Sequence, residues 1–351
     1  MKYSIVIPCY RSSHTIRQVV TETSKELDRL GRTPYEFILV DDFSPDEGAT
    51  VRELRAIAAD FDCVTVVELA RNAGQHNAIM AGLHYANGDI IILMDDDMQT
   101  HPSQLNSLLA KFDEEYDVVY GYYPDKKHSA FRNFGSWLNY TTVRVLIGKP
   151  KDLRTSSYCL MRKFVRDSII EYPAQYSHMQ GLVLRTVSPD RIASVPIQHF
   201  ERAYGTSTYS FKKLIALWSN IAGFSIVPLR MSRRAGEVLS AVGIIGMIWL
   251  VLRKFLNSTK ILGWTSTMMA IIFFAGVILI TLGILGEYVG RMFLTIGNYP
   301  QFVVREVHGQ GKTRKAPTRA HAAPTAGPGS TAADGSGGND SGGDCPGREG
   351  S

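Results

Sequence analysis

Three consecutive carboxylates are the residues of this sequence best suited to chemistry. They are Asp95, Asp96 and Asp97. The apolar run Ile90 to Met94 directly precedes them, which predicts that a buried strand delivers the triplet to one edge of a sheet. Carboxylates crowded this closely repel one another, and a hard cation such as Mg²⁺ or Mn²⁺ that also bridges ligand phosphates relieves the repulsion. A solvated acidic turn before a helix that starts near Pro102 is the alternative for this segment alone.

The elements that position the triplet are predicted by five apolar runs separated by longer amphipathic stretches. The runs are Tyr3 to Pro8, Phe37 to Val40, Val64 to Leu69, Ile90 to Met94 and Val118 to Tyr120. This alternation is typical of an α/β fold in which helices cover both faces of a parallel sheet. Ligands of such folds bind at the carboxyl ends of the strands.

Polar side chains follow four of these runs and are therefore predicted to converge on one crevice. A nucleoside needs an aromatic or apolar wall and a carboxylate, and its diphosphate needs a metal, all of which this edge supplies. No GxGxxG loop follows the first run and no Walker loop is present, which disfavours a dinucleotide site.

A second feature lies far down the chain, where no charged residue occurs from Ile261 to Gly286. About 20 apolar residues suffice to cross a bilayer, and the shorter run Val238 to Leu252 would complete a helical hairpin. Two buried helices of a soluble core are the alternative. The segment from Phe211 to Arg230 mixes lysines with apolar residues, so it predicts an amphipathic helix at the membrane surface or, alternatively, an ordinary packing helix.

Basic residues on both sides of the hairpin predict its orientation. They are Lys212, Lys213, Arg230, Arg233 and Arg234 before it, and Arg291, Arg305, Lys312, Arg314 and Lys315 after it. The flanks carry more basic residues than the loop between the two spans. This excess predicts a two-span protein of the inner or plasma membrane, with the catalytic domain and both termini in the cytoplasm. The net charge of +5 is modest, and the basic residues do not alternate with aromatic residues on one face. Both features argue against a nucleic-acid partner.

Six motifs together carry a resemblance to a known family. They are IPCY near the start, VDDFSPD at 40–46, RNAGQHNAIMAGL at 71–83, DDDMQ at 95–99, HFERAYGTSTYS at 199–210 and LGEYVGR at 285–291. The set resembles the family 2 glycosyltransferases that load polyprenyl phosphates. These include the dolichyl-phosphate mannose synthases, the bactoprenol glucosyltransferases and the undecaprenyl-phosphate formamido-arabinose transferases.

The resemblance implies a GT-A fold, with a Rossmann-like, mostly parallel sheet, followed by amphipathic interface helices and a transmembrane hairpin. The expected segments are a catalytic domain at 1–209, interface helices at 210–234, two transmembrane helices at 235–292, a cytoplasmic return segment at 293–308 and a disordered tail at 309–351. Relatives associate through their membrane helices, so a homo-oligomer is expected.

The resemblance also implies the roles of individual residues. Pro8, Tyr10, Val40 and Asp42 would hold the nucleoside; Asp95 and Asp96 would lie near the ribose and diphosphate; Asp95 and Asp97 would bind Mg²⁺ or Mn²⁺; Arg202 would contact the donor phosphate; Arg132 and Ser136 would meet the acceptor phosphate. The catalytic set is then Asp95, Asp97, Arg132 and Arg202.

The implied reaction is an inverting transfer of a sugar from a nucleotide-diphosphate sugar to polyprenyl phosphate. The product would serve glycan or cell-envelope modification. The stretch GQHNAIMAG resembles the formamido-arabinose transferases most, which favours a UDP-sugar as donor.

Several positions depart from the family pattern. Ser12 replaces a common Glu, Thr208 replaces a phosphate-binding Lys of the mannose synthases, and Ser156 and Ser157 lie near a missing Asp. Asp152 is either a substitute for that carboxylate or an ordinary loop residue, and His76 either reaches the donor sugar or caps a helix.

Two other functions stay open. A processive polysaccharide synthase shares the acidic motif, but its QxxRW segment is absent, because no Trp of this sequence follows an Arg. A non-catalytic membrane scaffold that binds nucleotide sugar is the second alternative.

Overall fold

The computed structural model describes residues 1–124, 144, 148–175, 177–198, 200, 227–256, 264–297 and 299–309. The chain divides into two compact units. The first comprises Met1–Gly135, Lys149–Thr208 and Pro300–Ser351, and the second comprises Ser136–Gly148 and Tyr209–Tyr299. The predicted domain boundaries at 209, 234, 292 and 308 stay predictions.

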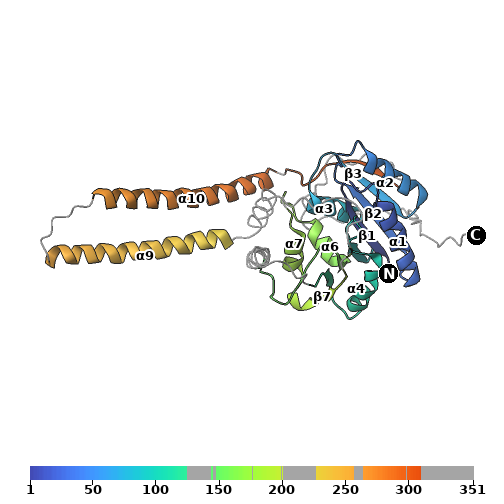
Figure 1. The fold of residues 1–351 in the computed structure, drawn as a ribbon, viewed down its shortest axis with the longest axis horizontal. Helices are drawn as coiled ribbons and strands as arrows, with labels where there is room; N and C mark the ends of the chain where they lie inside the picture. The colour runs from blue at the N-terminus through green and yellow to red at the C-terminus, as the bar shows by residue number, and fades with distance from the viewer. Residues whose placement is uncertain are drawn as a thin grey trace, which may run out of the picture. The chain divides into compact units, whose positions relative to one another are not determined.

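An eight-stranded sheet forms the centre of the first unit (Figure 1). Its strands are β1 (Tyr3–Cys9), β2 (Tyr35–Asp41), β3 (Val64–Leu69), β4 (Ile90–Leu93), β5 (Val118–Tyr122), β6 (Cys159–Arg162), β7 (Ile192–Pro196) and β8 (Val304–His308). Their order is β7-β5-β6-β4-β1-β2-β3-β8, and only the pairings made by β6 and β8 are antiparallel among these strands. The mostly parallel sheet and the five strands expected from the apolar runs are confirmed.

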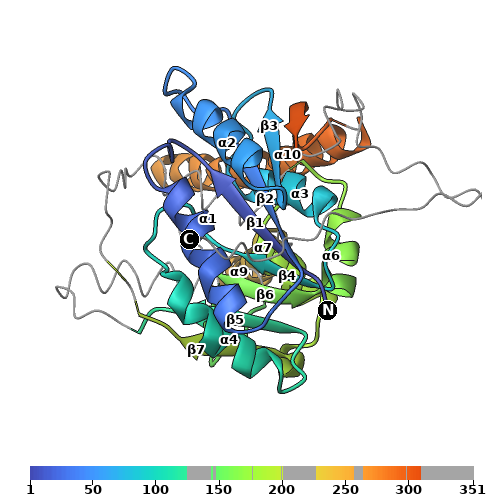
Figure 2. The ribbon, with the colours of Figure 1, turned by 90° about the vertical axis from the view of Figure 1, so that its right-hand side faces the viewer.

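Helices cover both faces of this sheet (Figure 2). One face carries α1 (Ile16–Arg29), α2 (Ala49–Asp60) and α4 (Leu105–Phe112), and the other carries α3 (Gln75–Tyr85), α6 (Lys163–Ile170) and α7 (Met179–Thr186). Two short 3₁₀ helices, Pro102–Gln104 and Pro189–Arg191, complete the unit. Every residue of β1 is buried because both of its faces are covered.

A close approach between α3 and the sheet requires Gly82. A Cβ atom at this position would lie 2.5 Å from Cγ1 of Val6 and 3.0 Å from Cγ2 of Val40. The glycine therefore lets α3 lie directly on β1 and β2. This contact sets the distance between α3 and those two strands.

The segment after the second long helix returns to the sheet. Strand β8 pairs antiparallel with β3, with Glu306 opposite Glu68 and His308 opposite Val66. Residues expected to form only a return segment thus supply an edge strand of the catalytic sheet. Sequence reasoning missed this strand together with β6 and β7, which are only four or five residues long.

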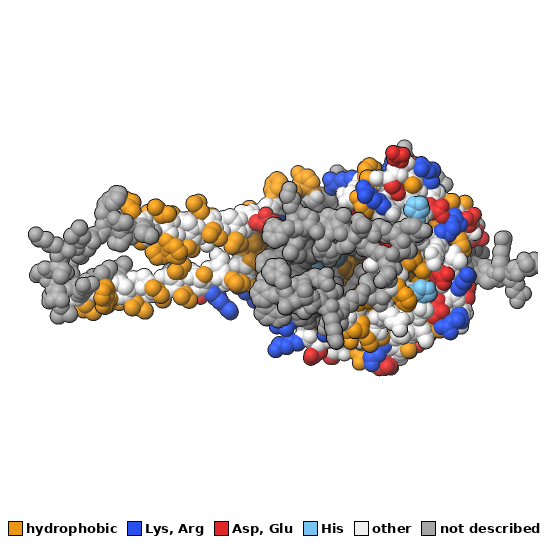
Figure 3. Space-filling model, in the orientation of Figure 1, with side chains coloured by type: hydrophobic (Ala, Val, Ile, Leu, Met, Phe, Trp, Pro, Cys, Tyr) orange, Lys and Arg blue, Asp and Glu red, His pale blue; other side chains and the backbone are white. Residues whose placement is uncertain are grey.

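The second unit contains two long helices, α9 (Val227–Leu256) and α10 (Trp264–Ile296). They lie side by side, and the Ser232 hydroxyl donates a hydrogen bond of 3.2 Å to Oγ1 of Thr281 (Figure 1). Figure 3 shows apolar side chains along both helices. Within the described residues, the segment Ala270–Ile296 is long and apolar enough to cross a membrane, and an 18-residue window of it has a mean hydropathy of 2.3.

The other predicted span, Val238 to Leu252, lies inside α9 and stays a prediction. Helix α9 already begins at Val227, within the segment 210–234 that was expected to form interface helices. The earlier part of that segment lies outside the described residues.

Candidate active site

The candidate site lies at the carboxyl ends of the parallel strands. Cys9 of β1 is opposite Asp41 of β2, and Val6 of β1 is opposite Leu93 of β4. The residues that follow these three strands therefore meet at one edge of the sheet, as the sequence predicts.

Asp96 connects the acidic triplet to the loop after β1. Its Oδ2 atom accepts a hydrogen bond of 3.0 Å from the backbone N–H of Tyr10, and its carbonyl oxygen accepts one of 2.6 Å from the Thr15 hydroxyl. Burial raises the pKa of Asp96. The Tyr10 side chain is 48% exposed, and the Arg11 guanidinium lies 5.7 Å from the centre of its ring. Tyr10 thus offers an accessible aromatic surface beside Asp96.

Asp42 holds the loop that leads into α3. Its two carboxylate oxygens accept hydrogen bonds from the backbone N–H groups of Ala73, at 2.6 Å, and Gly74, at 3.0 Å. Burial raises the pKa of Asp42, and these two hydrogen bonds act in the opposite direction. The carboxylate predicted to bind the nucleoside is therefore also engaged in positioning the loop. Pro8 and Val40 are both buried within their strands.

The same loop then reaches Asp95. The side-chain amide of Gln75, the first residue of α3, donates to Oδ1 of Asp95 at 2.9 Å. The Ser157 hydroxyl donates to Oδ2 of the same carboxylate. Asp95 is therefore oriented by two hydrogen-bond donors that come from segments distant in sequence.

Electrostatics single out Asp95 within the triplet. Burial raises its pKa to about 6, and the hydrogen bond from Ser157 opposes this rise. The charges of Asp97 and Asp96 raise the pKa of Asp95 further, which shows that the carboxylates lie close enough to repel. A divalent cation fits this arrangement, because it would relieve both the repulsion and the burial of negative charge.

Asp97 is held by the turn that follows it. Its Oδ1 atom accepts a hydrogen bond of 3.1 Å from the N–H of Gln99, whose carbonyl oxygen accepts one of 3.0 Å from the N–H of Phe200. Phe200 therefore lies against the turn that follows the acidic triplet. The remaining predicted residues, Arg132, Ser136 and Arg202, lie outside the described residues, so their assignments stay predictions.

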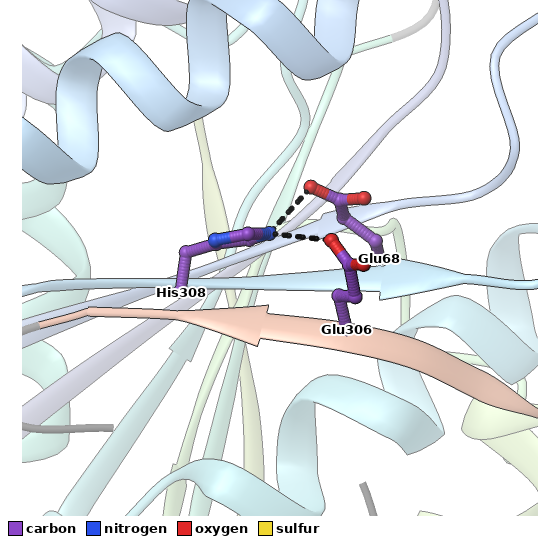
Figure 4. A group of neighbouring side chains, drawn as sticks. All are labelled: Glu68, Glu306 and His308. Carbon is purple, nitrogen blue, oxygen red and sulfur yellow. Dashed lines mark ion pairs between the residues drawn. The ribbon is translucent and has the colours of Figure 1, made fainter. Parts of the chain in front are cut away.

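Another group has the composition of a metal site. Among the described residues, ligand atoms of Glu68, Glu306 and His308 lie within 4.8 Å of one another (Figure 4). Nε2 of His308 lies 2.9 Å from Glu68 Oε1 and 3.3 Å from Glu306 Oε2. Arg55 donates to Glu68 at 2.6 and 2.8 Å and to Glu306 at 2.9 Å. Because this guanidinium already supplies positive charge, we interpret the group as an ion-pair network that holds β8 on β3.

The structure shows the surroundings of residues whose roles the sequence left undecided. Ser12 is buried, and its N–H donates to the Thr50 hydroxyl at 3.0 Å. Asp152 is exposed, whereas Ser157 contacts Asp95 directly. His76 makes no helix-capping hydrogen bond, since Gly74 is the N-cap of α3 and no side chain caps it.

Sequence reasoning missed several contacts of these residues. Gln75 and Thr15 bind the triplet, and His178 lies near His76 and Lys149. Gln75 belongs to the motif RNAGQHNAIMAGL at 71–83. Its position at the start of a helix that follows a strand could have predicted that it lies at the site. No local pattern pointed to His178 or Lys149, because their proximity depends on the tertiary fold.

The family of the chain is shown by its similarity to known proteins. Residues 4–170 match the model of glycosyl transferase family 2. The undecaprenyl-phosphate 4-deoxy-4-formamido-L-arabinose transferase of Proteus mirabilis (strain HI4320) is 32% identical over 319 residues, which cover 90% of this chain and 96% of the relative. The chain belongs to glycosyl transferase family 2.

Further similarities accompany this family membership. The transferase of the same name from Enterobacter sp. (strain 638) is 30% identical over 313 residues, covering 88% of this chain and 94% of that relative. Among solved structures, glucosyl-3-phosphoglycerate synthase from Mycobacterium tuberculosis, in complex with Mn²⁺, UDP-glucose and phosphoglyceric acid, has a TM-score of 0.48. It is 20% identical, and the alignment covers 64% of this chain and 79% of that chain. The family 2 chain described here is thus similar to its curated relatives over nearly its full length.

Proposed function

We propose that this family 2 glycosyltransferase moves a single sugar from a nucleotide-diphosphate sugar to a polyprenyl phosphate. The observation that carries the proposal is the similarity to undecaprenyl-phosphate transferases, which covers 90% of this chain and 96% of the relative. The alignment is too long to be confined to the sheet domain, so it includes part of the region of the long apolar helices. A UDP-sugar is the donor we place first.

The donor site is proposed to use the residues assembled at the edge of the sheet. Tyr10 and Asp42 would contact the nucleoside, and Asp95 and Asp97 would hold Mg²⁺ or Mn²⁺. When bound, the cation would neutralise charge on the diphosphate leaving group. Gln75 and Ser157 keep the Asp95 carboxylate oriented for this role.

The acceptor requires positioning more than activation. A phosphate monoester has a second pKa near 6, so at pH 7 its oxygen is already largely an anion and needs no general base. The absence of a carboxylate at Ser156 and Ser157 is compatible with such a reaction. An acceptor oxygen would form a bond to the anomeric carbon while the bond to the diphosphate breaks, and the electron pair would leave with the nucleoside diphosphate. This single displacement inverts the anomeric configuration.

Phosphate recognition completes the proposed site. Arg202 would contact the donor phosphate, and Arg132 with Ser136 would contact the lipid phosphate. Arginine suits both tasks because its guanidinium donates two parallel hydrogen bonds to phosphate oxygens.

The membrane arrangement is part of the same proposal. Helices α9 and α10 would form a two-span hairpin, with the catalytic unit and both termini in the cytoplasm. The exposed apolar side chains of α10 would face lipid or a second copy of the chain. A homo-oligomer formed through these helices is proposed on this basis.

Nucleoside diphosphate release by the detergent-purified protein tests the function. UDP- and GDP-sugars are supplied with Mn²⁺ or Mg²⁺, with and without undecaprenyl phosphate, and EDTA serves as the metal-free control. The proposal predicts release that requires both the lipid and the metal. Nucleotide-sugar binding without lipid-dependent release from any donor would instead favour the scaffold.

A further inference from the structure

Three titratable side chains form a cluster that has no part in the roles given above. His76 lies at the amino-terminal end of α3, His178 immediately precedes α7, and Lys149 lies in the segment before β6. The two imidazole rings are 5.2 Å apart between centroids and inclined by 47°. Burial lowers the pKa of His178 to about 4, and electrostatic interactions with His76 and with Lys149 lower it further, so both groups lie near His178.

The hydrogen-bonding state of His178 is defined by the helix that it caps. Its Nδ1 atom accepts a hydrogen bond of 3.1 Å from the N–H of Gly181. The proton of the neutral ring is therefore assigned to Nε2, which makes that atom a donor. His178 is only 7% exposed, so its ring is neutral near pH 7 because burial disfavours the charged form.

His76 contributes a second neutral imidazole. Burial lowers its pKa, and its Nδ1 atom is buried without a hydrogen-bond partner among the described residues. A buried ring nitrogen that lacks a partner is unfavourable, and a bound ligand is one way in which it is satisfied.

Lys149 adds a cation to the two neutral rings. Its ammonium group donates to the Thr155 hydroxyl at 3.0 Å. Burial lowers the pKa of Lys149 to about 8, and the nearby Arg154 guanidinium lowers it further. The side chain therefore remains mostly charged at pH 7. Its ammonium group, which carries three N–H donors, is partly buried.

Two residues that lie close to this cluster in the sequence bind Asp95. Gln75, which precedes His76, donates to Asp95 Oδ1 at 2.9 Å. Ser157, two residues after the Thr155 that binds Lys149, donates to Asp95 Oδ2. A donor whose diphosphate is held at Asp95 would therefore present its sugar close to these groups.

We propose that His76, His178 and Lys149 bind the glycosyl group of the donor and select among sugars through its hydroxyl or other oxygen substituents. The inference rests on the proposed transferase function and adds the residues that determine sugar specificity. Imidazole N–H and ammonium groups donate to sugar oxygens, and the unpaired ring nitrogen of His76 completes the set. A site built to hydrogen-bond a substrate oxygen strongly rejects an analogue that lacks it.

The test compares nucleotide binding with sugar discrimination in the full-length protein in detergent. The probes are UDP, UDP-glucose, UDP-galactose, UDP-N-acetylglucosamine and UDP-glucuronic acid, each with Mn²⁺, and turnover is measured with undecaprenyl phosphate. The variants are His178→Asn, which retains a capping side chain for α7, together with Lys149→Met, Lys149→Arg and His76→Gln. Lys151→Met is the matched control, because Lys151 is exposed and lies two residues from Lys149.

The expected result separates the sugar from the nucleotide. The Kd for UDP should stay within about twofold in all variants, whereas kcat/KM for the preferred UDP-sugar should fall about tenfold in His178→Asn and Lys149→Met, the loss of one hydrogen bond. Lys149→Arg should retain more activity than Lys149→Met, and the control should match the wild type. Wild-type sugar preference in every variant, or UDP affinity that falls in parallel with kcat/KM, would overturn the inference. Wild-type protein without lipid-dependent turnover of any probe would overturn the proposed function as well.

Discussion

Asp95 is held in the folded protein at an electrostatic cost, so its removal should increase stability. Its pKa is raised to about 6 from an ordinary value of 3.8. Ionisation at pH 7 therefore stabilises the unfolded chain more than the folded one, by about 3 kcal/mol at most. Asp95→Asn removes this difference and retains an oxygen that accepts a hydrogen bond from Gln75 or Ser157.

The destabilisation of the folded protein by Asp95 depends on pH. The folded state binds the proton more tightly than the unfolded chain, so the penalty is absent below about pH 4 and complete above about pH 6. In metal-free buffer at pH 7.5, the thermal unfolding midpoint of Asp95→Asn should exceed that of the wild type by about 5–10 °C. The difference should vanish near pH 4.

Two controls make this comparison specific. Asp152→Asn removes an exposed carboxylate, and its midpoint should match the wild type at every pH. Added Mn²⁺ should raise the midpoint of the wild type but not that of Asp95→Asn, because only the wild type retains the proposed ligand. A midpoint for Asp95→Asn that is unchanged at pH 7.5, or equally raised at both pH values, would refute the reasoning.

Three further substitutions test the site and the packing that supports it. Asp97→Asn should reduce lipid-dependent nucleotide release by about 100-fold or more while the protein stays folded, and unchanged release would contradict the metal assignment. Arg55→Met leaves Glu68, which is 3% exposed, without its main counter-charge, so it should destabilise the protein by about 1–3 kcal/mol; an unaltered thermal midpoint would show that the network contributes nothing. Gly82→Ala places a Cβ atom 2.5 Å from Val6 and should lower the unfolding free energy by about 1–3 kcal/mol in denaturant titrations, whereas a neutral effect would mean that α3 shifts freely.

Local pattern was sufficient for the part of the fold that positions the acidic triplet. The apolar runs predicted β1 to β5, because each is a continuous buried strand between polar turns. The position of Asp95 immediately after a strand followed from the same pattern. Family resemblance added the class of enzyme, which the match to glycosyl transferase family 2 confirms.

The remaining features depend on contacts that no local pattern encodes. The Ser157 hydroxyl reaches Asp95 only because β6 pairs antiparallel with β4, and β6 has just four residues. The ion pair between Arg55 and Glu306 joins residues 251 positions apart. His178 approaches His76 because α7 packs against α6, which in turn packs against α3. Periodicity reports which face of an element is buried, but not which distant element covers it.

Identification of the lipid product tests the central claim most directly. The purified protein is incubated with undecaprenyl phosphate, Mn²⁺ and the donor found by the release assay, and the organic phase is analysed by mass spectrometry and NMR. The account predicts undecaprenyl phosphate carrying one sugar, linked through phosphate with the anomeric configuration opposite to that of the donor. A product with retained configuration, a lipid carrying several sugars, or sugar that remains in the aqueous phase would contradict it.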